Sequence, residues 1–566
     1  MKKKLQVGRK SQKLNIKPIH EVARSVGIKK KYLENYGGNI AKISLEILKS
    51  IRKKNTGKYI LVTSITPSPI GEGKTVTSIG LAMAFKKLNK KSILCMAQPS
   101  LSSIFNSKKV ATGGGHARIV PTENINLHFT GDIHAVMAAH NLCAAYLENS
   151  IYNGNPLDIN PENIAWRRVS GINDRSLRNI NTGLGGKADG ISRKTGFDYV
   201  GSSELIGILT LSSGLSDMRL RIGKIVVGFT TKGRPITCED IKAAGAMAAL
   251  LKDAIKPNLV QTSDNTPCLV HSGASEITSL GLSSVIADKI ALGFSEYAIA
   301  ETEHGCDLSV EKFIDIKCRT SGIKPDAVVL VCSVRTLKMH SGDIEINNDK
   351  VPREALRENV SAVERGLPNL EHQIEIIKTF GIPVVVCINR FDEDTDKEIH
   401  AIERRVEGYG AHSVCVSRAW SSGNQGSLEL AKKVMEACKV KSSHIFLYTP
   451  DMSVKEKIKR IAKTIYSAKD VTFSDEAERT IQFLRKQKID TLPVFIVKTG
   501  LSISHNPKRK GRPHGFNFPI EEIELMQGAG YITATSANVD SMPSMPAIPF
   551  GTNIDIAEEG RIVGIG

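Results

Sequence analysis

A loop of ten residues contains the side-chain types that proteins use to bind phosphate groups, and it reads Thr66-Pro67-Ser68-Pro69-Ile70-Gly71-Glu72-Gly73-Lys74-Thr75. It lies between an apolar strand-like segment, 59–64, and an apolar helical segment, 75–88. At such a junction the helix N-terminus faces an anion, and glycines let the backbone approach it. The Lys74 ammonium can reach the β- and γ-phosphates, and the Thr75 hydroxyl is a type of group that binds Mg²⁺. We therefore predict that Pro67 to Thr75 bind ATP, with Lys74 catalytic and Thr75 a magnesium ligand.

The loop departs from the strict Walker A pattern at one position, where Ser68 replaces glycine. A Gly-Lys-Thr sequence after a strand also occurs in turns that bind nothing. Here the strand, the helix and a returning strand at 92–96 form one βαβ unit. That context favours phosphate binding over a structural turn.

Alternating helical and strand-like segments predict an α/β fold with a largely parallel sheet. Further strands are expected at 224–229, 327–334, 382–388 and 414–417, and further helices at 19–26, 41–49 and 398–409.

Three regions are expected along the chain. Residues 1–360 would form the P-loop nucleotide-binding and main catalytic domain. Residues 361–445 would form a small α/β domain, entered where a helix breaks at Gly366-Leu367-Pro368. Residues 446–566 would form a C-terminal α/β domain, in which 455–488 is charged and helical.

The charge of the chain is strongly basic, with 77 basic and 58 acidic residues and a net charge of +19. Nucleic-acid binding would require basic clusters interleaved with aromatics. The clusters at 29–31 and 508–510 are short and no such motif accompanies them, so nucleic acid is not an expected partner. Polyanionic substrates would also favour a positive field, but we favour a surface of solvated charge as the simpler explanation.

The compartment is predicted from apolar runs and cysteines. The apolar run 243–251 is far shorter than the roughly 20 residues needed to cross a bilayer, and no secretory signal is evident. Ten cysteines are scattered with no C-x-x-C spacing, which indicates reduced thiols. We predict a cytoplasmic protein without membrane association.

Strings beyond the phosphate loop carry a family resemblance. They are Pro99-Ser100-Leu101, Gly113-Gly114-Gly115, 125–132, Asn173-Asp174-Arg175, 251–259, 315–319, 337–340 and 366–370. From about Ile16 to the C-terminus the chain resembles formate–tetrahydrofolate ligases. The resemblance implies an ATP-dependent carbon–nitrogen ligase of one-carbon metabolism. In that reaction formate attacks the γ-phosphate of Mg·ATP, and the formyl phosphate formed passes its formyl group to N10 of tetrahydrofolate. The products are 10-formyltetrahydrofolate, ADP and phosphate. The family resemblance also implies a homotetramer that responds to monovalent cations.

The resemblance places the folate site on four residues: Phe391, Trp420, Gln98 and Asp132. Family members stack the pterin between two aromatics, which match Phe391 and Trp420. Either aromatic could instead belong to the core. Both follow strands in polar loops, where ligand residues of an α/β sheet are expected, so we favour the pterin platform.

Several segments depart from the family pattern. Where the family carries an arginine expected to hold the formate or formyl-phosphate oxygens, this chain has Ala97, whose side chain donates no hydrogen bond. The loops 102–110, 271–281 and 303–307 are also rewritten. Lys108, Lys109 or Arg118 could restore the missing charge from nearby in the sequence. Two hypotheses remain open: an active ligase, and a catalytically impaired paralogue that binds nucleotide or folate in a regulatory or partner role.

Overall fold

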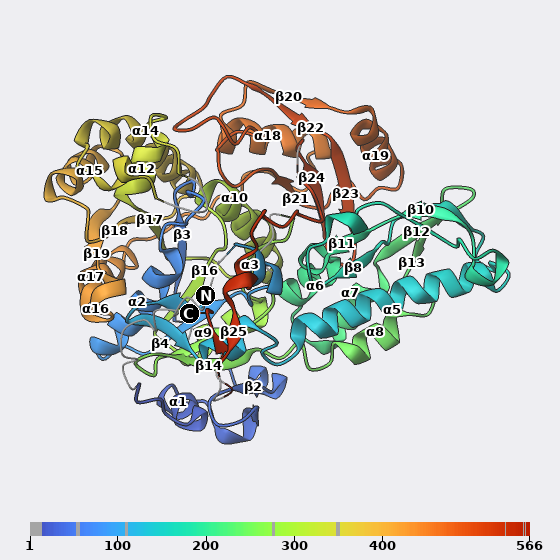
Figure 1. The fold of residues 1–566 in the computed structure, drawn as a ribbon, viewed down its shortest axis with the longest axis horizontal. Coiled ribbons are helices and arrows are strands. Elements are labelled where there is room, and N and C mark those ends of the chain that lie inside the picture. The colour runs from blue at the N-terminus through green and yellow to red at the C-terminus, as the bar shows by residue number, and fades with distance from the viewer. Residues whose placement is uncertain are drawn as a thin grey trace, which may run out of the picture.

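The computed structural model of the chain describes residues 14–51, 57–107, 111–273, 278–346, 351–537, 539–557, 560 and 562–565. Its largest element is a 12-stranded sheet with the order β1-β2-β14-β15-β4-β16-β3-β17-β18-β19, to which the hairpin β5–β6 adds at β14 (Figure 1). Neighbouring strands from β15 to β19 are parallel. In sheet order the strands span Leu33–Asn35, Ala41–Ile43, Asn258–Thr262, Pro267–Val270, Ser92–Met96, Tyr297–Glu301, Lys58–Ser64, Ala327–Cys332, Val384–Asn389 and Ser413–Ser417, and the hairpin spans Gly113–Gly114 and Ala117–Val120.

Both faces of the parallel strands are buried, which explains their continuous apolar sequences. Successive residues of β3 alternate between two apolar cores: Tyr59 and Leu61 belong to one, Ile60 and Val62 to the other. Helices α9, α14 and α15 pack on the first face, and α2 and α17 on the second. These helices span Val285–Phe294, Val360–Thr379, Asp396–Gly408, Lys74–Lys87 and Leu428–Ala437.

The predicted βαβ unit is present, with one refinement. β3, α2 and β4 lie within one or two residues of their predicted ends. β16 is inserted between β3 and β4 in the sheet, so the crossover spans one intervening strand. An acidic residue, Glu301, thereby ends the strand beside the loop 66–75.

One expected element is wrong. The segment 41–49 is not an α-helix, because Ala41 and Lys42 pair with β14 and a 3₁₀ helix, Leu45–Ser50, follows. The strand expected at 224–229 is present, but it lies outside the parallel sheet. This strand, β12, Val226–Thr230, lies in a separate antiparallel sheet with β7, Ile159–Ile164, and β13, Pro235–Thr237.

The expected helix break at Pro368 is also wrong, because Pro368 lies inside α14. A proline within a helix costs about 3 kcal/mol. The neighbouring Gly366 explains why the helix persists: a Cβ built on it would lie 1.9 Å from the carbonyl oxygen of Leu337. The backbones of α14 and of α12, Val334–His340, are therefore in direct contact, and Leu367 and Leu370 are buried. Tertiary packing outweighs the local preference.

The segment 361–445 has no sheet of its own. Its strands β18 and β19 continue the central sheet beyond β17. By contrast, the region after 446 contains the small sheets β20–β22 and β21–β24–β23 beside α18 and α19 (Figure 1), and a third, β25–β26, with strands Asp555–Ile556 and Ile562–Val563. The strands of the first two sheets and the two helices span, in the order named, Asp470–Phe473, Asn517–Ile520, Val494–Val497, Tyr531–Thr535, Glu522–Met526, Val454–Tyr466 and Asp475–Lys486.

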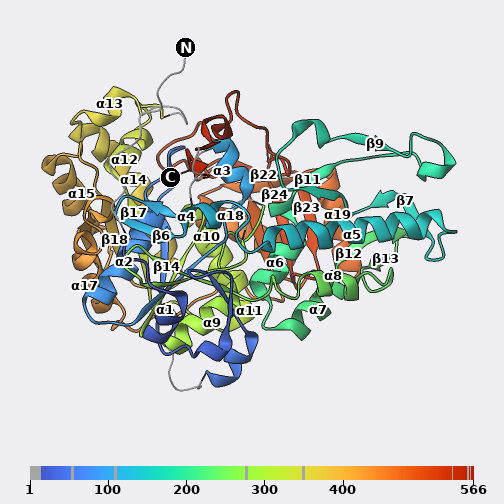
Figure 2. The same ribbon diagram turned by 60° about the horizontal axis from the view of Figure 1, so that its bottom comes forward.

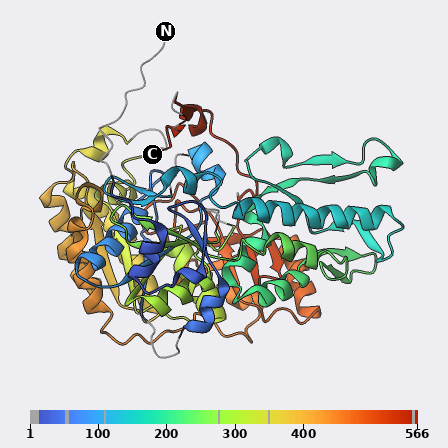
Figure 3. The ribbon, with the colours of Figure 1, turned by 90° about the horizontal axis from the view of Figure 1, so that it is seen from below.

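An insertion that the sequence pattern did not predict projects from one side of the central sheet (Figures 2 and 3). It contains the long helix α5, Asp132–Tyr152, the helices α6 to α8, and a hairpin of β9 and β10 at its outer part. The helices α6, α7 and α8 span Glu204–Leu211, Leu215–Gly223 and Ala244–Leu250, and the strands β9 and β10 span Ile180–Thr182 and Arg193–Thr195. Across the described residues, no helix combines the length and apolar character needed to span a membrane.

Candidate functional site

The loop 66–75, which the sequence predicts to bind a nucleotide and which we call the nucleotide loop, follows β3 and leads directly into α2, whose first residue is Lys74. Gly71 and Gly73 both adopt left-handed backbone conformations, with φ of +79° and +76°. Residues with a Cβ rarely adopt this conformation, so the two glycines shape the loop. Gly73 precedes the helix and carries no side chain to cap it, which leaves the N-terminal N–H groups of α2 facing outward from the helix end. The arrangement suits an anion.

The Glu72 carboxylate links the loop to the start of α12 by hydrogen bonds. Its side chain is buried, and its carboxylate accepts hydrogen bonds from the backbone N–H and the hydroxyl of Ser68 at 2.9 and 3.1 Å. The hydroxyls of Ser333 and Thr336, at the start of α12, donate to the same carboxylate at 2.7 and 2.6 Å. Glu72 therefore holds the loop against α12 and is occupied by protein donors.

Other side chains of the loop also point into the protein. Ser68 is buried, and Ile70 packs against an apolar cluster that contains Met339, Ile344 and Ile346. The loop consequently offers an anion mainly its backbone N–H groups, together with Lys74 and Thr75.

Lys74 and Thr75 both contact the segment at the end of β16. The Lys74 ammonium donates to the carbonyl oxygen of His304 at 3.2 Å, and the Thr75 hydroxyl donates to Glu301 Oε1 at 2.6 Å. Glu301 is not among the residues predicted from the sequence. An acidic residue that ends an apolar strand at the carboxyl edge of a parallel sheet was the signal that could have identified it.

The arrangement of Thr75 and Glu301 fits a magnesium ion. Because the Thr75 hydroxyl donates its hydrogen to Glu301, its oxygen lone pairs remain available to a cation. Glu301 is 7% exposed, and its second oxygen, Oε2, is buried with no hydrogen-bond partner among the described residues. Burial raises the pKa of the Glu301 carboxyl, while Lys74 and the hydroxyls of Thr75 and Ser78 oppose that shift. A threonine hydroxyl with a nearby carboxylate is how phosphate-loop proteins hold Mg²⁺.

The two predicted folate aromatics follow adjacent strands. Asn389 and Ser417, the last residues of β18 and β19, are paired in register, and Phe391 and Trp420 follow them by two and three residues. Trp420 is 58% exposed. Its indole lies against the β5 hairpin, since a Cβ built on Gly114 would lie 2.1 Å from Trp420 Cζ3. One part of the indole thus rests on glycine backbone while more than half of the residue's surface stays accessible, as a stacking platform requires.

Phe391 is partly covered on one face. The Arg335 guanidinium carbon lies 3.6 Å from the centroid of its ring. Arg335 was not singled out from the sequence, although it follows the carboxyl end of β17.

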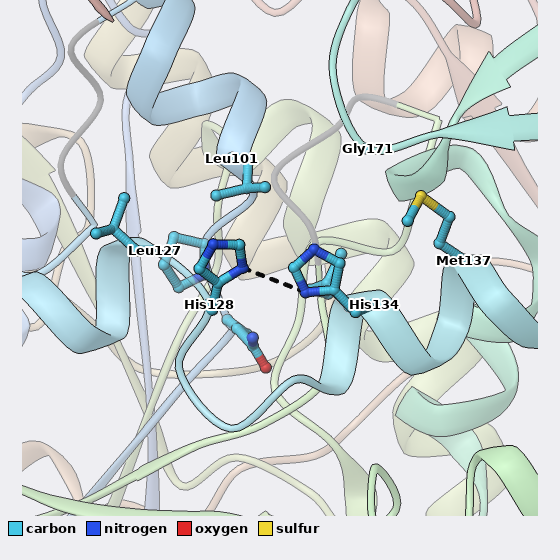
Figure 4. A pocket seen from close by; sticks show the side chains of 9 residues that line it. Leu101, Leu127, His128, His134, Met137 and Gly171 are labelled. Carbon is cyan, nitrogen blue, oxygen red and sulfur yellow. Dashed lines mark hydrogen bonds between the residues drawn. The ribbon is translucent and has the colours of Figure 1, made fainter.

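Gln98 and Asp132, the other two predicted folate residues, lie in different surroundings. Gln98 is buried and lines a small pocket with His128 and His134, whose Nδ1 atoms are 3.4 Å apart (Figure 4). Asp132 is buried, and its carboxylate accepts from Lys42 at 2.7 Å and from Asn258 at 2.7 Å. Both Asp132 oxygens therefore already have protein donors.

Ala97 lies at the end of β4, against the loop that follows β15. A Cβ built on Gly273 would lie 2.4 Å from the Ala97 Cβ, and Gln98 N–H donates to the Ser272 carbonyl at 2.6 Å. The side chain at position 97 contributes no charge to this edge of the sheet. Lys108 and Lys109, suggested as substitutes, lie outside the described residues, as do 274–277.

Comparison with known proteins agrees with the resemblance in the sequence. The family model described as formate–tetrahydrofolate ligase matches residues 5–566. Three curated relatives carry that same name. The protein of Desulforamulus reducens is 45% identical over 97% of this chain and 97% of its own. The protein of Roseiflexus sp. is 46% identical over 98% of this chain and 99% of its own length. The protein of Saccharopolyspora erythraea is 44% identical over 97% of each chain. The chain belongs to the formate–tetrahydrofolate ligase family of enzymes.

Proposed function

We propose that this chain joins formate to tetrahydrofolate with ATP, through formyl phosphate. The observation that carries the proposal is the nucleotide loop: two glycines with positive φ present the start of α2, and Lys74 with it, at the carboxyl edge of a parallel sheet. The identity of the substrates is inferred from family membership, and the location of the nucleotide is inferred from the loop.

The bonds change in two steps. A formate oxygen attacks the γ-phosphorus, the bond to the bridging oxygen of ADP breaks, and formyl phosphate forms. N10 of tetrahydrofolate then attacks the formyl carbon and displaces phosphate, with loss of the N10 proton. The first step needs neutralised phosphate oxygens and an in-line approach.

The residues of the loop provide that neutralisation. On binding, Lys74 would exchange the His304 carbonyl for phosphate oxygens, as a charge-assisted contact is stronger than a neutral one. The N–H groups at the start of α2 would take the remaining oxygens. Thr75 and Glu301 would hold the magnesium ion, which supplies charge neutralisation between the phosphates. We assign ATP binding to the loop from Pro67 to Thr75, in which Ser68, Ile70 and Glu72 act by shaping the backbone.

Phe391 and Trp420 would bind the pterin by stacking. Their support is the exposure of Trp420 and the adjacency of β18 and β19, which places both rings at the same edge as α2. Gln98 is proposed to border the folate. Both carboxylate oxygens of Asp132 accept hydrogen bonds, from Lys42 and Asn258. Asp132 would therefore border the folate by holding the start of α5 in place, without donating or accepting a bond to the ligand.

Three broader properties also remain proposals. A cytoplasmic location is supported by ten buried cysteines that are all free thiols. A homotetramer and a response to monovalent cations are supported by family membership alone.

Ala97 favours a second candidate function, an impaired paralogue that keeps nucleotide or folate binding. A missing charge-assisted contact at the reacting group removes about 3 kcal/mol of transition-state stabilisation, roughly 100-fold in rate. The two candidates are separated by assaying the purified protein with formate, tetrahydrofolate and Mg·ATP beside Ala97→Arg. The proposed function predicts product from the wild-type chain. A silent wild type with an active Ala97→Arg variant would establish the impaired paralogue.

A further inference from the structure

Arg335 is a partly buried cation whose Nε has no hydrogen-bond partner in the described part of the chain. It is the second residue of α12, and its guanidinium carbon lies 3.6 Å from the centre of the Phe391 ring. Its Nε is buried with no hydrogen-bond partner among the described residues, while the residue as a whole is partly exposed. A guanidinium nitrogen is a strong donor, so an Nε that lacks an acceptor leaves Arg335 able to bind an anionic ligand.

Two of the acids nearby, Glu72 and Asp394, already accept hydrogen bonds from other groups. Glu72, Asp394 and Glu393 act on Arg335 electrostatically, while burial lowers the pKa of the guanidinium. The Glu72 carboxylate, however, is filled by Ser68, Ser333 and Thr336, and Asp394 accepts from the backbone N–H of Phe391 at 2.8 Å. None of them bonds the guanidinium.

The position of Arg335 is fixed relative to the nucleotide loop. Ser333 and Thr336, on either side of it in the first turn of α12, both bond Glu72 inside the loop. Two residues before Phe391, Asn389 donates to the backbone oxygen of Glu72 at 3.0 Å. Arg335 and the ring on which it stacks are therefore both tethered to the residue that precedes Gly73.

We propose that Arg335 is a phosphate-binding residue, whose guanidinium, positioned over the Phe391 ring, donates to phosphoryl oxygens of the bound nucleotide. A planar guanidinium presents donors in a fork that matches phosphate geometry, and stacking on the ring fixes that fork before the ligand arrives. Arg335 would give the site a second cation beside Lys74. In the order of strands, Arg335 follows β17 on one side of β3, whereas Ala97 follows β4 on the other side. The inference rests on the proposed nucleotide site and adds to it a residue and its ligand group.

The alternative ligand for Arg335 is the folate, whose pterin carbonyl or glutamate carboxylate is also an acceptor. Phe391 is the predicted pterin platform, so the two ligands are neighbours. Measuring the affinities for ADP and for tetrahydrofolate separately shows which of the two ligands Arg335 binds.

The test measures the affinities of Mg·ATP, Mg·ADP and tetrahydrofolate by calorimetry for four proteins: wild type, Arg335→Met, Arg335→Lys and Arg365→Met. Arg365 is an exposed arginine on α14 that pairs with Asp343, and its replacement changes net charge equally. Thermal unfolding checks that each variant folds.

We expect Arg335→Met to weaken ATP and ADP binding about 10- to 100-fold, the range for a hydrogen bond to a charged group. Arg335→Lys should recover part of the loss, and Arg365→Met should match the wild type. Nucleotide affinities in Arg335→Met equal to those of the control would overturn the inference, as would a loss confined to tetrahydrofolate. If the wild type itself binds no nucleotide, the proposed function falls first and this inference with it.

Discussion

The side-chain amide of Asn389 donates to the backbone oxygen of Glu72 at 3.0 Å, and so joins the end of β18 to the nucleotide loop. The same amide fills the space beside Gly73, where a Cβ would lie 2.1 Å from Asn389 Nδ2. The nucleotide loop and the strand that leads to Phe391 therefore share one contact surface.

Gly73→Ala tests the loop geometry. The new methyl group would collide with Asn389 in a backbone conformation that alanine rarely adopts, so we expect ATP affinity to fall at least about 10-fold. The free energy of unfolding should drop by about 1 to 3 kcal/mol. Calorimetry and urea denaturation measure both. Gly245→Ala, in open space on α8, is the matched control and should leave ATP binding intact; equal effects in both variants would contradict the geometry.

Glu72→Gln tests the link between the loop and α12. An amide keeps the size of the side chain but places an NH₂ group against hydroxyl and N–H donors. We expect the free energy of unfolding to fall by about 1 to 3 kcal/mol and ATP affinity to fall with it. If urea denaturation and calorimetry show neither change, Glu72 does not hold the loop.

The local sequence was sufficient to predict the strand and the helix that flank the loop 66–75. Strand, glycines and helix follow one another within one βαβ unit, and β4 has the predicted bounds of 92–96. The inward direction of Glu72 was not predictable, because its partners Ser333 and Thr336 come from a strand end more than 250 residues away. Glu301 carries a local signal, as the acidic end of an apolar strand, but its place beside the loop depends on the order of strands in the sheet.

The wrong predictions share a physical cause. Ala41 and Lys42 have helical propensity, yet pairing with β14 holds them in a strand. Pro368 remains inside α14 because Gly366 packs that helix against α12. In both places non-local contacts outweigh local preference, and a single sequence carries no direct signal of such contacts.

Trp420→Leu tests the folate platform. Losing the indole surface should raise the KM for tetrahydrofolate about 10-fold, the scale of one lost stacking contact of 1 to 3 kcal/mol. The KM for ATP should change little. Tyr152→Leu removes an aromatic of similar exposure at the end of α5, 56% against 58%, and serves as control. A larger effect on ATP than on tetrahydrofolate would argue against the assignment.

His340 predicts a pH dependence of stability. It lies beneath the nucleotide loop, where one ring nitrogen bonds the Thr66 carbonyl and the other accepts from Gly511 N–H. Burial lowers the pKa of His340 to about 4. Between the unfolded pKa of about 6.5 and pH 4 the unfolded chain binds the proton more tightly. His340 thus contributes full stability above pH 6.5 and loses it as the pH falls toward 4.

The variant His340→Gln isolates this contribution from other buried histidines. The wild type should lose on the order of 3 kcal/mol more than the variant between pH 7 and pH 4. Denaturation curves across that range measure the difference. Parallel pH profiles for the two proteins would show that His340 is not held neutral.

Transfer of the γ-phosphoryl group to formate is the central claim, and oxygen labelling tests it most directly. Formate labelled with ¹⁸O is incubated with the purified protein, Mg·ATP and tetrahydrofolate, and the released phosphate is analysed by mass spectrometry. If formyl phosphate forms, one formate oxygen stays on phosphorus when N10 takes the formyl carbon, so the phosphate carries one ¹⁸O. The formation of 10-formyltetrahydrofolate with unlabelled phosphate, or the absence of both products, would contradict the account.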